Sequence, residues 1–369
     1  MRLTALTTDH LRVPLGKPGR VSLTDPAPAG PAALDLIVVH AETDTGLTGF
    51  GFAVVGGPGA AAVRGLIDAE VAPLVAGTDP RQPEQRFAAA EAHFRGVGFA
   101  GLAARAYSAV DIALWDLKAK AAGMPLWELL GAARPAAPFF VSDVAVGRPA
   151  ADVVKQAKPL LKQGATAVRI EVGGGDVRAD ADRVREISDG LGEDAAVCVA
   201  AGGRYELGTA EALTHFFEDV GVEWFEDPLP AADQIGYAKL AGMAEIPIAV
   251  GSSFGTRDRF FQTIRDGVIR VVRPDVGRLG GITPVLKVAA VAEAFGVSVS
   301  PVRLTEVGVH LACGLPAVTR VDRVDGMADV FAGGPQVADG KLAPPAAPGL
   351  GLTLAPGVEK WRVGGGCGT

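Results

Sequence analysis

The alternation of hydrophobic and polar positions changes its period along the chain. In the first 55 or so residues, two runs at 2–12 and 34–42 alternate as in an antiparallel sheet, and a Pro- and Gly-rich segment at 15–31 joins them. Apolar residues then recur at helical spacing in three segments, at residues 60–76, 83–94 and 104–122. We therefore predict a small N-terminal α+β domain at residues 1–132.

From residue 138 onward, short apolar runs alternate with helical segments. The strand-like runs lie at residues 139–144, 167–172, 196–201, 222–228, 247–252, 268–276, 297–301 and 318–322. Eight strand and helix repeats that close on themselves form a (β/α) barrel, whose site lies at the C-terminal strand ends. We predict the barrel at residues 133–335 and a loop-rich tail at 336–369 that packs back on the N-terminal domain.

Composition narrows the classes of partner and compartment. The net charge of −7 is spread along the chain without basic clusters, so nucleic acid and anionic membranes are not expected partners. The sequence has no run of 18 apolar residues and no cleavable leader, which indicates a cytoplasmic protein. Cys198, Cys313 and Cys367 are far apart and odd in number, so we expect neither a disulfide framework nor a structural zinc site.

Several motifs together carry a resemblance to a known family. They lie at residues 37–49, 109–118, 125–131, 224–228 (Trp-Phe-Glu-Asp-Pro), 274–276, 280–283 and 348–351 (Pro-Gly-Leu-Gly). In this order they resemble the mandelate racemase/muconate lactonizing branch of the enolase superfamily. The resemblance implies an enolase-type (β/α) barrel with an N-terminal α+β capping domain, and a homo-oligomer. It also implies Mg²⁺-assisted removal of the proton α to a carboxylate, which gives an enolate.

The metal positions that the resemblance implies are Ala200, Glu226 and Ser252. Of these, Glu226 offers a carboxylate, and Mg²⁺ is anchored in proteins by one or more carboxylates. We therefore expect a degenerate metal site and no cofactor, with Mg²⁺ bound only if ligands outside the family pattern, such as Asp227 and water, assist Glu226.

The bases that the resemblance implies are also replaced. The family's Lys-x-Lys at the end of the second barrel strand becomes Arg169-Ile170-Glu171. Asp275 of the family's His/Asp dyad is kept, while Val302 stands at the His position, and Asp322 lies near the acid of the eighth strand. No Lys or His falls at a C-terminal strand end, so any proton-transfer group is expected to be a carboxylate, with Tyr205 and Cys198 as the alternatives.

Strand parity predicts which charges converge. Alternate residues of a strand share a side, so Arg169 lies with Glu171, Arg273 with Asp275, and Arg320 with Asp322. An unpaired buried charge costs several kcal/mol, so we expect Arg169 to contact Glu226 or another barrel carboxylate directly. Three interpretations stay open: a salt-bridge plug in place of the metal, an Arg169 that acts electrostatically as Mg²⁺ does, or retained metal binding.

The candidate catalytic residues are Arg169, Glu171, Glu226, Asp275 and Asp322, and the candidate substrate-binding residues are Arg273, Ser252 and Asp227.

Two classes of function fit these residues. The first is a diverged isomerase or lyase that acts on a small carboxylate or hydroxy acid without the usual Mg-bound enolate site. The second is a non-catalytic descendant that binds a small molecule or serves as a partner protein. A shared fold does not decide between them, because function depends on the site.

Overall fold

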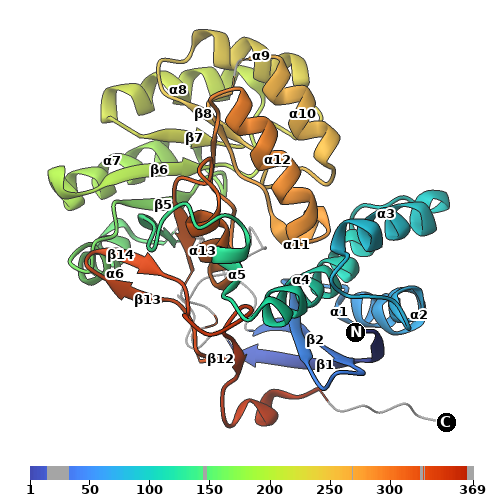
Figure 1. The fold of residues 1–369 in the computed structure, drawn as a ribbon. Helices are drawn as coiled ribbons and strands as arrows, with labels where there is room; N and C mark the ends of the chain where they lie inside the picture. The colour runs from blue at the N-terminus through green and yellow to red at the C-terminus, as the bar shows by residue number, and fades with distance from the viewer. Residues whose placement is uncertain (15–32, 144–147, 268, 325–326, 328, 364–369) are drawn as a thin grey trace.

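The computed structural model describes residues 1–14, 33–143, 148–267, 269–324, 327 and 329–363. The loop predicted at 15–31 lies outside the described residues. Two parts make up the chain, as Figure 1 shows: a blue to teal N-terminal part, and a green to orange barrel.

The N-terminal part is built on a three-stranded antiparallel sheet. Its strands are β1 (Leu3–Pro14), β2 (Ala33–Thr43) and β3 (Thr48–Val55), paired in that order. The helices are α1 (Ala60–Leu66), α2 (Ala72–Val75), α3 (Pro83–His93), α4 (Leu102–Ala122) and α5 (Leu126–Leu129), with a π-helical turn at Ile67–Val71 that joins α1 to α2. Helix α4 lies directly on β3, because Gly51 has no side chain: a Cβ there would lie 2.0 Å from the carbonyl oxygen of Ala109.

The barrel holds the eight strands that the sequence predicts. They are β4 (Phe139–Asp143), β5 (Ala167–Glu171), β6 (Ala196–Ala200), β7 (Trp224–Glu226), β8 (Ile248–Val250), β9 (Val271–Val272), β10 (Ser298–Val299) and β11 (Val321–Arg323). All pairs are parallel in the order β10-β9-β8-β7-β6-β5-β4-β11, and a bridge between Val299 and Val318 joins the two ends. The fold class is therefore the predicted enolase-type barrel with an N-terminal cap.

Helices alternate with these strands. They are α6 (Ala150–Leu161), α7 (Val177–Leu191), α8 (Leu207–Val220), α9 (Gln234–Met243), α10 (Arg257–Arg265), α11 (Val276–Leu279), α12 (Ile282–Ala294) and α13 (Thr305–Gly314). Strand β9 is much shorter than the predicted run at 268–276. Pro274 has no N–H for a strand ladder, and Asp275 leaves the strand to cap α11, where its Oδ1 accepts the backbone N–H of Arg278 at 3.0 Å.

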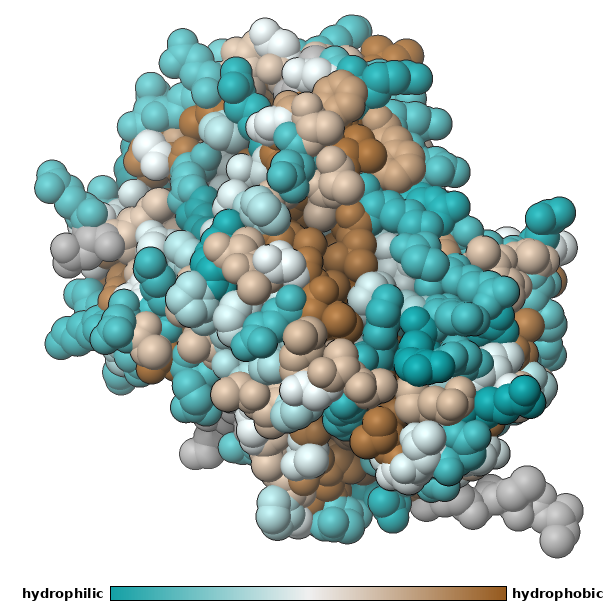
Figure 2. All heavy atoms as spheres, viewed as in Figure 1, coloured by the Kyte–Doolittle hydropathy of each residue, from teal (hydrophilic) through white to brown (hydrophobic). Residues whose placement is uncertain are grey.

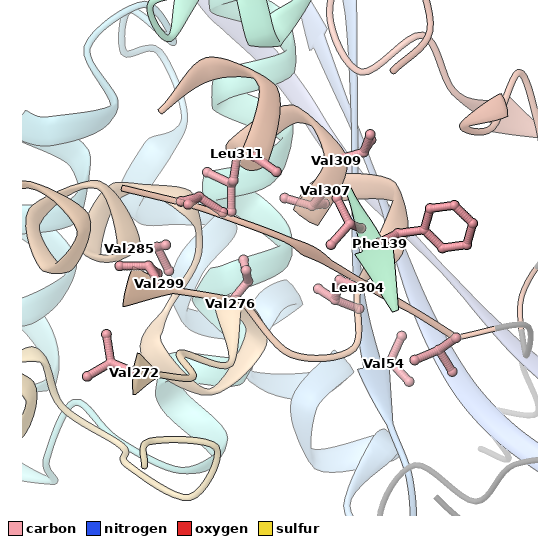
Figure 3. Close-up of a cluster of buried hydrophobic side chains, with 14 of the residues drawn as sticks. Val54, Phe139, Val272, Val276, Val285, Val299, Leu304, Val307, Val309 and Leu311 are labelled. Carbon is pink, nitrogen blue, oxygen red and sulfur yellow. The ribbon is translucent and has the colours of Figure 1, made fainter. Parts of the chain in front are cut away.

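One hydrophobic core runs from the barrel into the cap. Figure 3 shows Val54 of the cap sheet together with barrel residues such as Phe139, Leu304 and Val307. Full burial of side chains of this size stabilises a fold by about 1.5–3 kcal/mol each. Two polar contacts fix the same junction. Trp115 Nε1 of α4 donates to Thr283 Oγ1 of α12 at 2.9 Å, and the same hydroxyl donates to Asp111 Oδ1 at 2.6 Å.

The C-terminal segment touches both parts of the chain. It holds β12 (Phe331–Ala332), β13 (Gln336–Ala338), β14 (Lys341–Ala343), β15 (Thr353–Leu354) and a 3₁₀ turn at Val358–Trp361. Leu342 pairs with Ala137 of the barrel, and Arg362 bridges to Leu11 of β1. Asp116 of α4 accepts backbone N–H groups from both the cap sheet, at Phe50, and this segment, at Leu350. The domain boundaries at 132 and 335 stay a prediction.

The described surface and helices bear on the prediction about membranes. Figure 2 shows hydrophobic side chains gathered in a narrow strip in the middle of one face, with hydrophilic side chains on both sides. Within the described residues, no helix is long and apolar enough to cross a membrane.

Candidate functional site

Charged side chains from four strands meet at the C-terminal ends of the barrel strands. Arg169 of β5 donates two hydrogen bonds to Glu226 of β7, from Nε to Oε2 at 2.8 Å and from Nη2 to Oε1 at 3.0 Å. Arg273, which follows β9, donates to Glu226 Oε2 at 3.0 Å and to Asp322 Oδ2 of β11 at 2.9 Å. The direct contact between Arg169 and Glu226 confirms the prediction that Arg169 pairs with a barrel carboxylate. We call these four residues the buried ion network.

The buried ion network is held in its charged form. Glu226 and Arg273 are fully buried, and Arg169 and Asp322 nearly so. Burial would raise the pKa of Glu226, but the positive charges of Arg169 and Arg273 lower that pKa to about 2. Burial likewise opposes the charge of Arg169, yet Glu226 raises the pKa of its guanidinium above the ordinary value. Each charge has a partner with good geometry, which a buried ion pair requires.

Glu171 stands at the more accessible edge of this network. It ends β5, and its carboxylate lies 3.6 Å from Arg169 Nη1 and 3.5 Å from Arg204 Nη2. Its side chain keeps 13% of its exposed area, compared with none for Glu226. Arg204 is a site residue that the sequence reasoning missed. It follows the Gly202-Gly203 turn after β6, and this position just beyond a strand end is the signal that could have identified it.

Asp275 has an arginine partner where the family pattern has a histidine. Arg303 Nη1 donates to Asp275 Oδ2 at 2.9 Å. Val302, at the expected His position, bridges to Asp275 through the backbone. Sequence reasoning missed Arg303 because it is one residue beyond that position. Arg303 has φ = 72°, a left-handed conformation that is uncommon for a residue other than glycine.

Asp227 and Ser252 contact each other rather than the buried ion network. Asp227 Oδ1 accepts the backbone N–H of Gly251 at 2.9 Å, and its Oδ2 accepts the hydroxyl of Ser252 at 2.5 Å. Burial raises the pKa of Asp227, and the nearby charge of Glu226 raises it further. This pair orders the turn after β8, and its role in substrate binding stays a prediction.

Arg320 does not join the mouth, although its parity matches Asp322. It precedes β11 and forms an ion pair with Glu223, which precedes β7, so the pair lies at the opposite end of the barrel. Its guanidinium also lies over the ring of Trp224, 4.7 Å from the ring centroid. The strand is short enough that two residues along it move a long side chain from one end of the barrel lumen to the other.

Comparison with known proteins finds relatives of similar length. The chain is 32% identical over 348 residues to a 3,6-anhydro-alpha-L-galactonate cycloisomerase from Streptomyces coelicolor, covering 94% of this chain and 95% of the relative. A structure of a racemase from Streptomyces coelicolor with bound magnesium matches with a TM-score of 0.91 and 30% identity, covering 98% of this chain and 100% of that one. A Polaromonas L-talarate dehydratase in complex with Mg and L-glucarate matches with a TM-score of 0.87 and 29% identity, covering 98% of each chain.

These structures correct the expectation that no cofactor is involved. That expectation is wrong on this comparison, because both solved structures contain magnesium. It rested on the identities of three residues, whereas Mg²⁺ takes oxygen ligands from carboxylates, carbonyls and water all around the ion.

The three positions have their own partners in this chain. Ala200 has no oxygen on its side chain, Ser252 Oγ donates to Asp227, and both oxygens of Glu226 accept from Arg169. Among the described residues, no group of three or more His, Cys, Asp or Glu side chains is arranged to hold a metal ion. That the metal site of this chain is degenerate therefore stays a prediction.

Two family models together match most of the chain. The N-terminal domain model of mandelate racemase/muconate lactonizing enzyme matches residues 27–131, and the enolase C-terminal domain-like model matches residues 152–358. The motifs, the capped barrel and these matches agree over the length of the sequence. This chain therefore belongs to the mandelate racemase/muconate lactonizing branch of the enolase superfamily.

Proposed function

We propose that this chain is an isomerase or lyase that acts on a small sugar acid bound by its carboxylate at the barrel mouth. The observation that carries the proposal is the partly exposed Glu171 beside Arg169, whose own charge is fixed by the buried Glu226. Proton abstraction from a carboxylic acid requires a base that the substrate can reach and a positive charge that stabilises the anion formed. Glu171 and Arg169 supply these two groups. The cycloisomerase and dehydratase named above support this class of reaction.

Glu171 is the proposed base. Its distances to Arg169 and Arg204, 3.6 and 3.5 Å, are longer than those of a good hydrogen bond, so its oxygens are not fully engaged. In the proposed step the C–H bond α to the substrate carboxylate breaks, and the proton passes to a Glu171 oxygen. The electron pair moves toward the substrate carboxylate, where arginine N–H groups offset the new charge. The proton then returns to carbon in an isomerisation, or a β-hydroxyl leaves with a proton as water in an elimination.

Deuterium exchange tests this role. Sugar acids are incubated with the protein in D₂O containing Mg²⁺, and NMR follows exchange of the α-proton and formation of product. Glu171→Gln is expected to lower the rate at least about 100-fold, because a positioned base contributes this much. The matched control is Glu186→Gln, on the exposed face of α7, which should leave the rate unchanged. Equal rates in both variants would show that Glu171 is not the base.

A non-catalytic binding protein is the second candidate. It is favoured by Val302, which places a side chain without acid or base chemistry at the family's His position. This function predicts that a sugar acid binds in calorimetry while its α-proton never exchanges in D₂O. The homo-oligomer and the small-molecule carboxylate partner also stay predictions, and light scattering on the purified chain tests the former.

A further inference from the structure

Three guanidinium groups surround the carboxylate of Asp275 where the cap meets the barrel. Arg303 Nη1 lies 2.9 Å from Asp275 Oδ2, and Arg278 Nε of α11 lies 4.0 Å from the same oxygen. Arg105 comes from α4 of the cap, where its Nη1 donates to the carbonyl of Val54 at 2.7 Å. We call Arg105, Arg278 and Arg303 the arginine cluster.

Gly277 lets these groups come together. A Cβ at this position would lie 3.4 Å from Arg105 Nη1 and 3.3 Å from Asp275 Oδ1. The cap arginine therefore reaches over the start of α11 to the carboxylate, and the cluster joins the cap, the barrel and the segment after β10.

The arginine cluster carries more positive charge than its described partner neutralises. Burial would raise the pKa of Asp275, but the charges of Arg105, Arg303 and Arg278 bring that pKa below its ordinary value. The pKa of Arg105 is lowered as well, but here the lower pKa disfavours the charged form. Burial lowers the pKa of its guanidinium, Asp275 offsets this, and the charges of Arg278 and Arg303 lower it further. One carboxylate thus serves three cations among the described residues.

The arginine cluster also contains a buried N–H donor without a hydrogen-bond partner among the described residues. Arg278 Nε is buried and has no hydrogen-bond partner in the described structure. Asp275 Oδ1 is already used, because it accepts the backbone N–H of Arg278 at 3.0 Å. A buried donor without a partner costs about 1–3 kcal/mol, and an anion that entered the cluster would remove this cost.

Arg303, which contacts Asp275, has a strained backbone conformation. Its φ of 72° is unfavourable for a residue with a side chain, and its backbone N–H donates to Asp322 Oδ2 at 3.3 Å. Its side chain keeps 21% of its exposed area, so a ligand at the barrel mouth can reach it. Strain of this kind persists where surrounding contacts fix it, and it is concentrated at ligand-binding sites.

We propose that the arginine cluster binds a second carboxylate of the substrate, so that the protein selects sugar dicarboxylates over the corresponding monocarboxylates. The proposal rests on the proposed function, because Glu171 and Arg169 are taken to act at the other end of the same molecule. Strands β6, β7 and β8 lie between β5, which carries Arg169, and β9, after which the cluster begins. The two cationic groups are therefore across the barrel mouth from each other. Guanidinium groups suit this task because they bind carboxylates with two parallel hydrogen bonds.

Calorimetry with glucarate and gluconate of the same configuration tests this selectivity. The two acids differ at one end, where glucarate has a carboxylate and gluconate a hydroxymethyl group. At constant ionic strength and in the presence of Mg²⁺, the whole chain is expected to bind glucarate about ten- to a hundredfold more tightly, as expected for a hydrogen-bonded charge. Arg303→Gln and Arg278→Gln should each bring this ratio close to one. The matched control is Arg265→Gln, an exposed arginine paired with Asp266, which should keep the ratio of the unmodified chain.

A purely structural arginine cluster gives a different result. If the arginines only fasten the cap to the barrel, the variants will be less stable but will keep the ratio of affinities. An equal affinity for both acids in the unmodified chain, or a ratio that survives both substitutions, overturns the proposal and leaves the proposed function intact. Arg303→Lys keeps the charge without the two-pronged geometry, so the proposal expects an intermediate ratio.

Inorganic sulfate separates the cluster from the proposed function. Melting curves in sulfate and chloride at equal ionic strength should show a larger stabilisation by sulfate in the unmodified chain and in Arg265→Gln than in Arg303→Gln, because the general stabilisation of folded proteins by sulfate is common to all three. If neither sugar acid binds while sulfate gives this pattern, the proposed function is overturned and the anion site stands without its substrate. If neither sugar acid nor sulfate binds, both proposals are overturned.

Discussion

Replacing Glu226 by glutamine removes the central charge of the buried ion network while keeping its shape. The change leaves Arg169 and Arg273 buried beside a neutral amide. The pKa of Glu226 is lowered from an ordinary 4.5 to about 2, since the two arginines outweigh the effect of burial. A shift of this size corresponds to about 3 kcal/mol of stability at neutral pH. Breaking a buried ion pair from one side costs about 3–5 kcal/mol, which agrees.

Equilibrium unfolding in urea at pH 7 measures this loss. We expect Glu226→Gln to lower the free energy of unfolding by about 3 kcal/mol, which for a chain of this size lowers the melting temperature by about 4 °C. The control is Glu186→Gln on the exposed face of α7, where the loss should be close to zero.

The pH dependence gives the sign of the effect. Because the folded-state pKa of Glu226 is depressed, its stabilisation is complete above the ordinary value of 4.5 and is lost as the pH falls toward about 2. The difference between the unmodified chain and Glu226→Gln should therefore shrink across this window. A difference below about 1 kcal/mol at pH 7, or one that stays constant down to pH 3, would refute the assigned strength of the network.

Three further predictions concern the junctions of the fold. Asp116→Ala should lower the free energy of unfolding by about 3 kcal/mol in urea, because it leaves two buried backbone N–H groups without an acceptor, whereas Asp116→Asn should cost less. Gly51→Ala should lower it by about 1–3 kcal/mol, since its Cβ would lie 2.0 Å from a carbonyl oxygen of α4, and Gly65→Ala, with open space around it, should not. Burial lowers the pKa of His310 from 6.5 to about 4, so protonation of the unfolded chain should destabilise the fold as the pH falls through this window. His310→Gln should flatten that slope in melting curves recorded between pH 7 and 4.

At the strand ends of the barrel, the sequence pattern predicted some side-chain positions correctly and others not. Period-two alternation, together with the family positions that the resemblance implies, placed Arg169, Glu226 and Arg273 on the lumen side. The requirement that buried charges pair then predicted that Arg169 contacts Glu226 or another barrel carboxylate, and the structure shows the contact with Glu226. Parity fails for Arg320, because it fixes the side of the strand but not the depth in the barrel.

Residues outside the regular strands could not be placed in this way. Arg204 and Arg303 lie in turns whose course is set by glycines and by backbone strain, and neither follows a repeating period. Arg105 comes from the cap, almost 200 residues before Arg303, so no local pattern connects them to Asp275. The cofactor expectation failed for a related reason: it was drawn from three identities, while a metal site depends on every oxygen around the ion.

The sequence by itself determined the capped barrel, its eight strands and the charges at the strand ends, since hydrophobic period and motif order are properties of short segments. Beyond the contact of Arg169 with a barrel carboxylate, the tertiary structure alone decided which charges meet, because pairing depends on distances between segments far apart in the chain. It brought Glu226 between two arginines, gave Asp275 an arginine in place of histidine, and left the arginine cluster with more positive charge than Asp275 offsets. Electrostatic energy depends on separation and burial, and neither quantity exists until the chain is folded.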